Sequence, residues 1–80
     1  AFVDSMGWVQ FRLGNLDEAL RYLRRAFSMA PDGEVAAHLG EVLWATGQRD
    51  EALRVWRDGA AREPGNDVLQ ETLTRLKVGL

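Results

Sequence analysis

The only histidine of the chain lies among acidic residues at helical spacing. Glu34, His38 and Glu41 follow one another at intervals of four and three positions. On a helix these side chains share one face, where an imidazole and two carboxylates could in principle contact a metal ion. Three such residues on an exposed helix are usually solvated, so we predict no metal site and no cofactor.

Other kinds of catalytic chemistry find little support in the sequence. Ser5 and Ser28 have no nearby base to activate a hydroxyl group. No glycine-rich loop precedes a Lys-Ser or Lys-Thr pair, so a phosphate cradle is not expected. The stretch "PDGE" at 31–34 offers too few oxygen ligands for a calcium loop. We therefore predict that the chain is not an enzyme.

The composition of the chain excludes several further classes of function. Its 80 residues are 46% hydrophobic and 28% charged, as in an ordinary globular domain, and the net charge of −2 argues against a nucleic-acid partner. The absence of cysteine rules out disulfides and thiolate metal sites but does not decide the compartment. No apolar run approaches the roughly 18 residues that span a bilayer. Because Ala1 leads directly into an apolar-periodic segment, we expect a fragment of a longer chain.

A repeat organises the whole sequence. The segment 14–31 reads "GNLDEALRYLRRAFSMAP", and its counterpart 47–64 reads "GQRDEALRVWRDGAAREP". Without a gap, segments 1–31 and 34–64 share ten identical pairs: Gly7/Gly40, Val9/Val42, Gly14/Gly47, Asp17/Asp50, Glu18/Glu51, Ala19/Ala52, Leu20/Leu53, Arg21/Arg54, Arg24/Arg57 and Pro31/Pro64. A regular period of this length indicates a repeat array.

Each copy divides into two helical segments. Apolar spacing of three and four predicts helices over 2–13, about 15–30, 34–46 and 49–62. Asn15 is predicted to cap the second helix, Asp17 and Arg21 to pair at i,i+4, and Asn66 or Asp67 to cap a fifth helix that ends near Lys77. A hairpin of two helices cannot bury its apolar face alone, so the hairpins are expected to stack.

Several repeated residues have a mechanical role in this prediction. Gly7 and Gly40 would let a neighbouring helix approach closely, and Gly14 and Gly47 would form the turn inside each hairpin. Gly59 would lie inside a helix, where glycine costs roughly 0.5–1 kcal/mol relative to alanine. Tight packing at that position, or the bulk of nearby Trp56, would explain it.

This pattern resembles the tetratricopeptide repeat, a helix–turn–helix unit of about 34 residues. The residues that carry the resemblance are Met6-Gly7, Gly14, Ala19, Leu23, Ala26 and Pro31, with Leu39-Gly40, Gly47, Ala52, Trp56, Gly59 and Pro64 in the second copy. The resemblance implies an all-α, right-handed helical-hairpin solenoid of five helices. Its predicted parts are one repeat over 1–33, a second over 34–66, and a C-terminal capping helix with its tail over 67–80.

The segment from Ala36 to Leu76 also resembles the C-terminal end of tetratricopeptide-repeat lipoproteins of Gram-negative bacteria. That resemblance implies a scaffold or adaptor in the periplasm, tethered to the outer membrane by a lipid anchor outside this sequence, with a cytoplasmic location as the alternative. It also implies a protein or peptide partner, such as a carboxyl-terminal processing protease or its substrates. Direct insertion of this segment into a membrane is not expected.

In stacked repeats of this family the first helix of each pair lines the concave face. Outward positions at i, i+4 and i+7 would therefore line a binding surface, with aromatic and arginine side chains as its strongest contributors. The candidate residues for binding a protein or peptide segment are Asp4, Trp8, Phe11, Arg12, His38, Glu41, Trp44, Glu71 and Arg75.

Two alternatives to this binding surface stay open. Trp8 and Phe11 could instead pack against a preceding repeat, and Trp44 could lie in the core between repeats, which would make the chain a structural cap of a longer superhelix. Self-association is the other alternative, through an apolar face formed by Phe2, Val3, Tyr22 and Phe27. Trp56 replaces the core residue Leu23 and is predicted to be structural, and the arginines of the second helices are predicted to be solvated.

Overall fold

The computed structural model describes the backbone of residues 2–80 and the side chains from Gly7 onward. It contains helices α1 (Phe2–Arg12), α2 (Leu16–Met29), α3 (Gly33–Ala45), α4 (Arg49–Arg62) and α5 (Asp67–Leu76). The predicted all-α class is confirmed, and the predicted helix limits agree with the structure to within one residue. None of the helices described is long and apolar enough to cross a bilayer.

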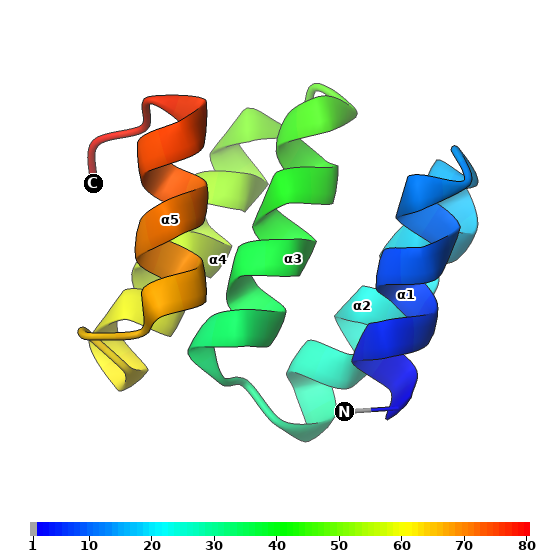
Figure 1. The fold of residues 1–80 in the computed structure, drawn as a ribbon, viewed down its shortest axis with the longest axis horizontal. Coiled ribbons are helices and arrows are strands. Elements are labelled where there is room, and N and C mark those ends of the chain that lie inside the picture. Colours follow the sequence, from blue (N-terminus) through cyan, green and yellow to red (C-terminus); the bar gives the residue numbers. More distant parts are fainter. Residues whose placement is uncertain (1) are drawn as a thin grey trace.

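The helices form two layers, as Figure 1 shows, with α1, α3 and α5 in front and α2 and α4 behind. Of the five, α3 contacts each of the other four helices, whereas α1 contacts α2 and α3. The largest fully buried side chains are Trp56, Leu23, Leu43, Leu69 and Val42. The core therefore surrounds α3, and α1 with α2 forms one edge of the molecule.

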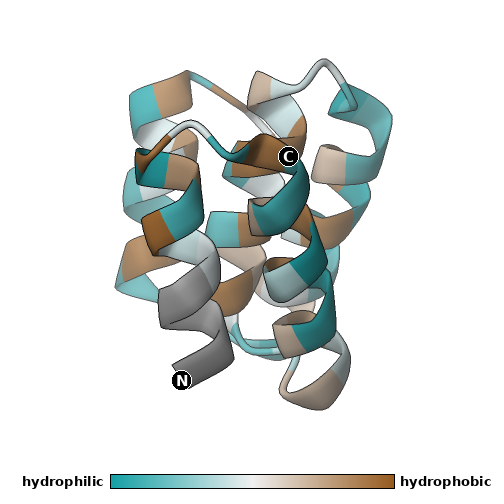
Figure 2. Cartoon of the chain, turned by 90° about the vertical axis from the view of Figure 1, so that its right-hand side faces the viewer, coloured by the Kyte–Doolittle hydropathy of each residue, from teal (hydrophilic) through white to brown (hydrophobic). Residues whose placement is uncertain are grey.

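Hydrophobic residues recur along each helix at intervals that place them on the side facing the core. Figure 2, seen from the edge formed by α1 and α2, shows hydrophilic and hydrophobic residues alternating within the turns of the helices. Such a pattern is typical of helices that bury one face and expose the other.

The turns inside the two hairpins are built alike. Gly14 and Gly47 both have φ of +84°, a left-handed conformation that residues with a Cβ rarely adopt. Because the two glycines follow α1 and α3 at equivalent positions, the same turn returns the chain onto the preceding helix in each hairpin. This confirms the role predicted for both glycines.

Helices α3 and α5 each have an N-cap residue whose side chain accepts a hydrogen bond from the backbone. The Asp32 carboxylate accepts a hydrogen bond from the Val35 amide (2.9 Å) at the start of α3, and the Asn66 side chain accepts one from the Leu69 amide (3.0 Å) at the start of α5. The predicted cap by Asn15 is wrong in its mechanism. Asn15 occupies the position before α2, but its side-chain amide donates to Gln10 Oε1 (2.7 Å) instead.

Close contact between helices explains the glycine inside α4. A Cβ at Gly59 would collide with the Cβ of Ala36, and the Gly33 backbone lies just beyond. This agrees with the expectation that tight packing at Gly59 offsets its low helix propensity. Trp56 is fully buried, as predicted, and its indole nitrogen donates to the carbonyl oxygen of Ala37 at 3.5 Å.

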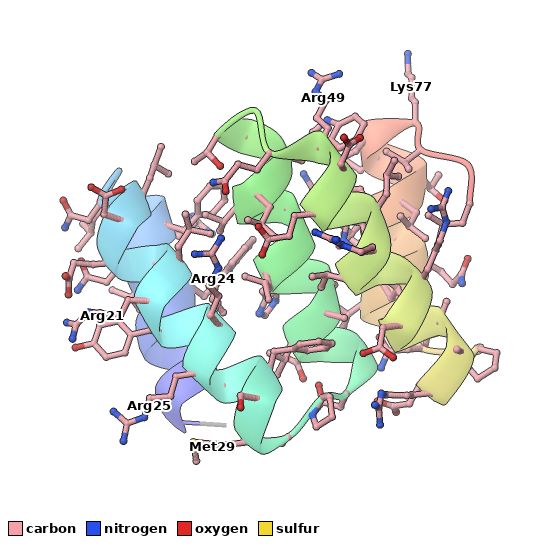
Figure 3. The ribbon with its side chains drawn as sticks, turned by 180° about the vertical axis from the view of Figure 1, so that it is seen from behind. Arg21, Arg24, Arg25, Met29, Arg49 and Lys77 are labelled. Atoms are coloured by element: carbon pink, nitrogen blue, oxygen red, sulfur yellow. The ribbon has the colours of Figure 1, made fainter. Side chains whose placement is uncertain are left out.

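The arginines of α2 are exposed on the back of the molecule. In Figure 3, Arg21 and Arg25 point outward, while Arg24 points toward α4. Arg21 pairs with Glu18 at 2.6 Å, so the predicted pair with Asp17 is wrong. Both carboxylates lie within one helical turn of Arg21, and the i,i+3 partner is the one it contacts. Arg24 donates to both carboxylate oxygens of Glu51 (3.0 and 3.2 Å), which links α2 to α4.

Candidate protein-binding face

Eight of the nine predicted binding residues have side chains that the structure describes. They lie on the three front helices α1, α3 and α5, which form one layer in Figure 1. Asp4 also lies on α1, but its side chain is outside the described part. The front layer thus carries the candidate surface, and the contacts within it divide into three groups.

The first group joins α1 to α3 through aromatic rings. The Trp8 and His38 rings are stacked, with centroids 4.2 Å apart and planes inclined by 17°. Phe11 lies one helical turn after Trp8, and their ring centroids are 5.1 Å apart. All three side chains are half-buried. Aromatic pairs of this kind contribute about 0.5–1.5 kcal/mol beyond the area they bury.

The second group joins α3 to α5 through a paired ion contact. The Arg75 guanidinium donates from Nη1 to Glu41 Oε2 (3.1 Å) and from Nη2 to Glu41 Oε1 (2.5 Å). The Glu41 side chain is 13% exposed and that of Arg75 is 49% exposed. The hydrogen bond to Glu41 raises the pKa of Arg75 above its ordinary value, and partial burial opposes this. The charges of Glu41 and Glu71 raise the Arg75 pKa further, although less strongly.

Trp44 belongs to a third group, which lies between α3 and α4. Its ring centroid is 5.5 Å from that of Trp56, and the Arg49 guanidinium lies 4.3 Å above it. Trp44 is close to the end of α3, where the turn brings the first residue of α4 alongside. Among the three aromatic candidates, Trp8 and Phe11 therefore lie together, whereas the ring contacts of Trp44 are with α4.

The two remaining candidates are exposed. Arg12 is in the last turn of α1, and Glu71 is one turn before Arg75 on α5. Both can contact a bound segment, and Glu71 also adds negative charge beside Arg75.

The repeat places the central members of the first two groups at equivalent positions. Glu41 follows Trp8 by 33 positions, and Arg75 follows Glu41 by 34 positions. The same position on three successive front helices therefore carries an aromatic, an acidic and a basic side chain. A segment lying across the front layer would meet aromatic surface on α1 and α3, and then paired charges on α3 and α5.

The acidic residues near His38 are already occupied or solvated. Glu41 is bound to Arg75, and Glu34 is exposed. Within the part of the chain that the structure describes, no group of three His, Cys, Asp or Glu residues is placed to hold a metal ion.

A groove at the far end of the molecule was missed by sequence reasoning. It has a volume of about 500 Å³ and lies against α5 and the tail that follows it. The signal that could have located it is the repeat itself, because the residues of α5 that line the groove are one period after residues of α3 that contact α4.

Two stacked helical hairpins with a fifth helix over the last one define an α-helical repeat protein. The sequence profile described as tetratricopeptide repeat matches residues 10–76 of this chain. The chain belongs to the tetratricopeptide repeat family. Such repeats are generally protein-interaction modules and are typically not enzymes.

Two curated relatives cover nearly the whole chain. The TPR repeat-containing protein PA4667 of Pseudomonas aeruginosa is 53% identical over 76 residues, which is 95% of this chain and 13% of that protein. The human Protein O-mannosyl-transferase TMTC1 is 28% identical over 72 residues, which is 90% of this chain and 8% of that protein. The chain thus spans a small part of the length of either relative.

Proposed function

We propose that the front layer of α1, α3 and α5 binds a segment of a partner protein, so that the chain acts as a scaffold or adaptor module. The observation that carries the proposal is the Trp8–His38 stack beside the Glu41–Arg75 pair on successive front helices. Tryptophan and arginine are the residue types that most often dominate the binding energy of protein interfaces.

The chemistry of the front layer suggests what the partner segment carries. An apolar or aromatic side chain would add to the stack at Trp8, and a charged side chain would meet the half-exposed Arg75 or Glu71. The carboxylate of Glu41 is already bonded through both oxygens, so it is less available to a partner than Arg75 is.

The test is binding by Trp8→Ala compared with binding by Arg25→Ala. Arg25 is exposed on α2 at the back of the molecule (Figure 3), so its loss serves as a matched control. A partner captured by the unchanged chain should bind Trp8→Ala at least about tenfold more weakly, which is about 1.4 kcal/mol. Circular dichroism should show unchanged helicity. Equal binding by both variants would remove the front layer from the proposal.

A second candidate function is structural, namely to close the end of a longer helical array. Val9 and Val42 occupy equivalent positions, yet Val9 is 51% exposed whereas Val42 is fully buried. The outer side of α1 and α2 is thus suited to cover by another helix. Self-association through that side is the competing use, and a mass that rises with concentration in sedimentation would favour it.

The partner and the compartment follow only from the likeness to bacterial lipoproteins of this repeat class. On that basis the chain would work in the periplasm as part of an adaptor for a carboxyl-terminal processing protease. Co-purification of such a protease with the chain from an envelope extract, and its loss with Trp8→Ala, tests this part of the proposal.

A further inference from the structure

The outer side of α5 carries a groove that the proposed front-layer site does not use. Its volume is about 500 Å³, and its walls include Ala60 of α4 and Val78 of the C-terminal tail. Gln70, Leu73 and Thr74 line it from α5, and Lys77 lines it from the residue after the helix. Lys77 is the charged member of this lining.

The N-caps of α3 and α5, Asp32 and Asn66, are 34 positions apart. The groove residues therefore correspond to residues 34 positions earlier, on a surface of α3 that another helix covers. Gln70 corresponds in this way to Ala36, and Thr74 to Gly40. Ala36 and Gly40 are in close contact with α4, through Gly59 and Trp56 respectively. The groove therefore continues, on α5, the kind of interface that joins α3 to α4 in the second hairpin.

The comparison of the groove with α3 also indicates which chemical groups a bound helix would carry. Lys77 stands one period after the fully buried Leu43, and Gln70 and Thr74 replace the smaller Ala36 and Gly40. A purely apolar helix would leave the Lys77 ammonium without a partner, which is costly on burial. The Gln70 amide already donates to the Pro64 carbonyl oxygen (3.3 Å) and needs no partner from the occupant. The Cβ of Thr74 would also exclude a large side chain like Trp56, because a Cβ at Gly40 would overlap that ring.

The backbone at Lys77 is a separate and unusual feature of the groove. Lys77 has φ of +58° and ψ of +45°, a left-handed conformation in which lysine is uncommon. The Val78 amide then donates to the Leu73 carbonyl (2.9 Å), which turns the tail so that Val78 and Leu80 flank the groove. Lys77 therefore lies at the junction of α5 and the tail, beside the apolar side chains that line the groove.

We propose that this groove binds an amphipathic α-helix of a partner protein, in the orientation that α4 has on α3. Ala36 lies opposite Gly59 and Gly40 lies opposite Trp56, so α3 and α4 pack antiparallel. By continuing this spacing we infer that Ala52 lies opposite Leu43, and both are fully buried. The bound helix therefore presents a carboxylate to Lys77, a small residue four positions later to Thr74, and another three positions further to Gln70. Its apolar side packs on Leu73 and Val78.

A peptide derived from α4 tests this proposal on the full 80-residue chain. The probe is a fluorescein-labelled peptide of residues 48–63 that carries Ala52→Glu and Trp56→Ala, measured by fluorescence anisotropy. We expect saturable binding that Lys77→Glu weakens about fivefold, since attraction becomes repulsion. A peptide with Ala52→Lys and Trp56→Ala should regain that affinity with Lys77→Glu. A peptide with Ala52→Glu alone should bind more weakly than the probe, because its Trp56 meets Thr74.

The controls separate this groove from the front layer. Arg25→Glu reverses an exposed charge on α2 and should leave the anisotropy titration unchanged, and Trp8→Ala should also have no effect on it. The absence of saturable binding, equal losses with Lys77→Glu and Arg25→Glu, or loss with Trp8→Ala would each overturn the proposal. A second copy of the chain is the alternative occupant, and sedimentation of the chain alone tests for it. A dimer that Lys77→Glu dissociates would assign the groove to the second copy instead of a partner helix.

Discussion

The two hairpins place the same residues at equivalent positions in different surroundings. Val42 on α3 is fully buried, whereas its equivalent Val9 on α1 is 51% exposed. The reason is position in the stack, because α3 contacts all four other helices and α1 contacts two. The repeated residues thus specify how a hairpin packs internally, while the neighbours of the hairpin decide which of its residues are buried.

A repeated glycine also lies at the helix crossing inside each hairpin. The side chain that packs against this glycine differs between the two hairpins. Gly7 lies against Leu23, whose Cγ would be 2.7 Å from an added Cβ. Gly40 lies against Trp56, and an added Cβ would overlap the indole ring. The second crossing is therefore more sensitive to added volume, since a buried indole ring cannot change shape as a leucine side chain can.

We expect the largest change in the free energy of unfolding from Gly40→Ala, with Gly7→Ala as its comparison. Overpacking a core costs about 1–3 kcal/mol, and replacing a helical glycine with alanine returns up to about 1 kcal/mol. We expect Gly40→Ala to lower the free energy of unfolding by about 2 kcal/mol, and Gly7→Ala by less than about 1 kcal/mol, since the Leu23 side chain can move. Urea denaturation followed by circular dichroism measures both.

Trp56→Leu sharpens this comparison by giving the second hairpin the residue that the first one has. In that background Gly40→Ala should cost at least about 1 kcal/mol less than alone, because residues in contact are not additive. If the cost of Gly40→Ala is the same in both backgrounds, the overlap with Trp56 does not explain it.

The next effect compares the two equivalent valines. Val42→Ala removes two methyl groups from a fully buried side chain and should cost about 2 kcal/mol. Val9→Ala at a half-exposed position should cost less than about 0.5 kcal/mol. The same denaturation experiment compares them. A partner helix bound over α1 should raise the cost of Val9→Ala, and equal costs in the free chain would show that Val9 is already covered in solution.

Most of the fold could be predicted from the sequence because its determinants are local and repeated. Turn glycines at 14 and 47, prolines at 31 and 64, and apolar spacing within helices each act over a short stretch of chain. The close approach of another helix at Gly40 was predicted from the same repeat, because a residue without a Cβ leaves room at a helix crossing. That Trp56 is the residue packed there was not predicted.

The parts that sequence reasoning missed depend on competition among nearby side chains. Arg21 had acidic residues at both i−3 and i−4, and periodicity alone cannot select Glu18 over Asp17. For Trp44 the sequence left two placements open, on the front surface or in the core between repeats, and spacing alone could not choose between them. Its ring lies near Arg49 and Trp56 of α4. Of the candidate site, the Glu41–Arg75 pair was foreseen only as two separate residues on one face.

A smaller effect compares the ends of the front helices. Glycines with φ of +84° follow α1 and α3, whereas α5 ends at Lys77 with φ of +58°. Glycine adopts this conformation without the penalty that a Cβ brings, so Lys77→Gly should raise the free energy of unfolding by about 1 kcal/mol. Lys77→Ala, which removes the charge but keeps the Cβ, should give no such gain. Thermal unfolding of the three chains distinguishes backbone strain from charge.

The smallest effect compares two equivalent arginines on the back of the molecule. Arg24 is paired with Glu51 across α2 and α4, whereas Arg57, its equivalent on α4, is exposed and forms no ion pair within the described residues. The Arg24 and Glu51 side chains are 47% and 34% exposed, so solvent screens their attraction. We expect Arg24→Ala to cost about 0.5 kcal/mol, and Arg57→Ala to have almost no effect on stability.

A double-mutant cycle isolates the contribution of that pair from the loss of either side chain. Combining Arg24→Ala with Glu51→Ala should give a coupling energy of roughly 0.5 kcal/mol, while Arg57→Ala with Glu51→Ala should give none. The Arg24–Glu51 coupling should shrink in about 1 M salt, where the Debye length is only about 3 Å. A coupling that is equal for Arg24 and Arg57 would mean that general charge on the back, rather than the contact between the hairpins, stabilises the stack.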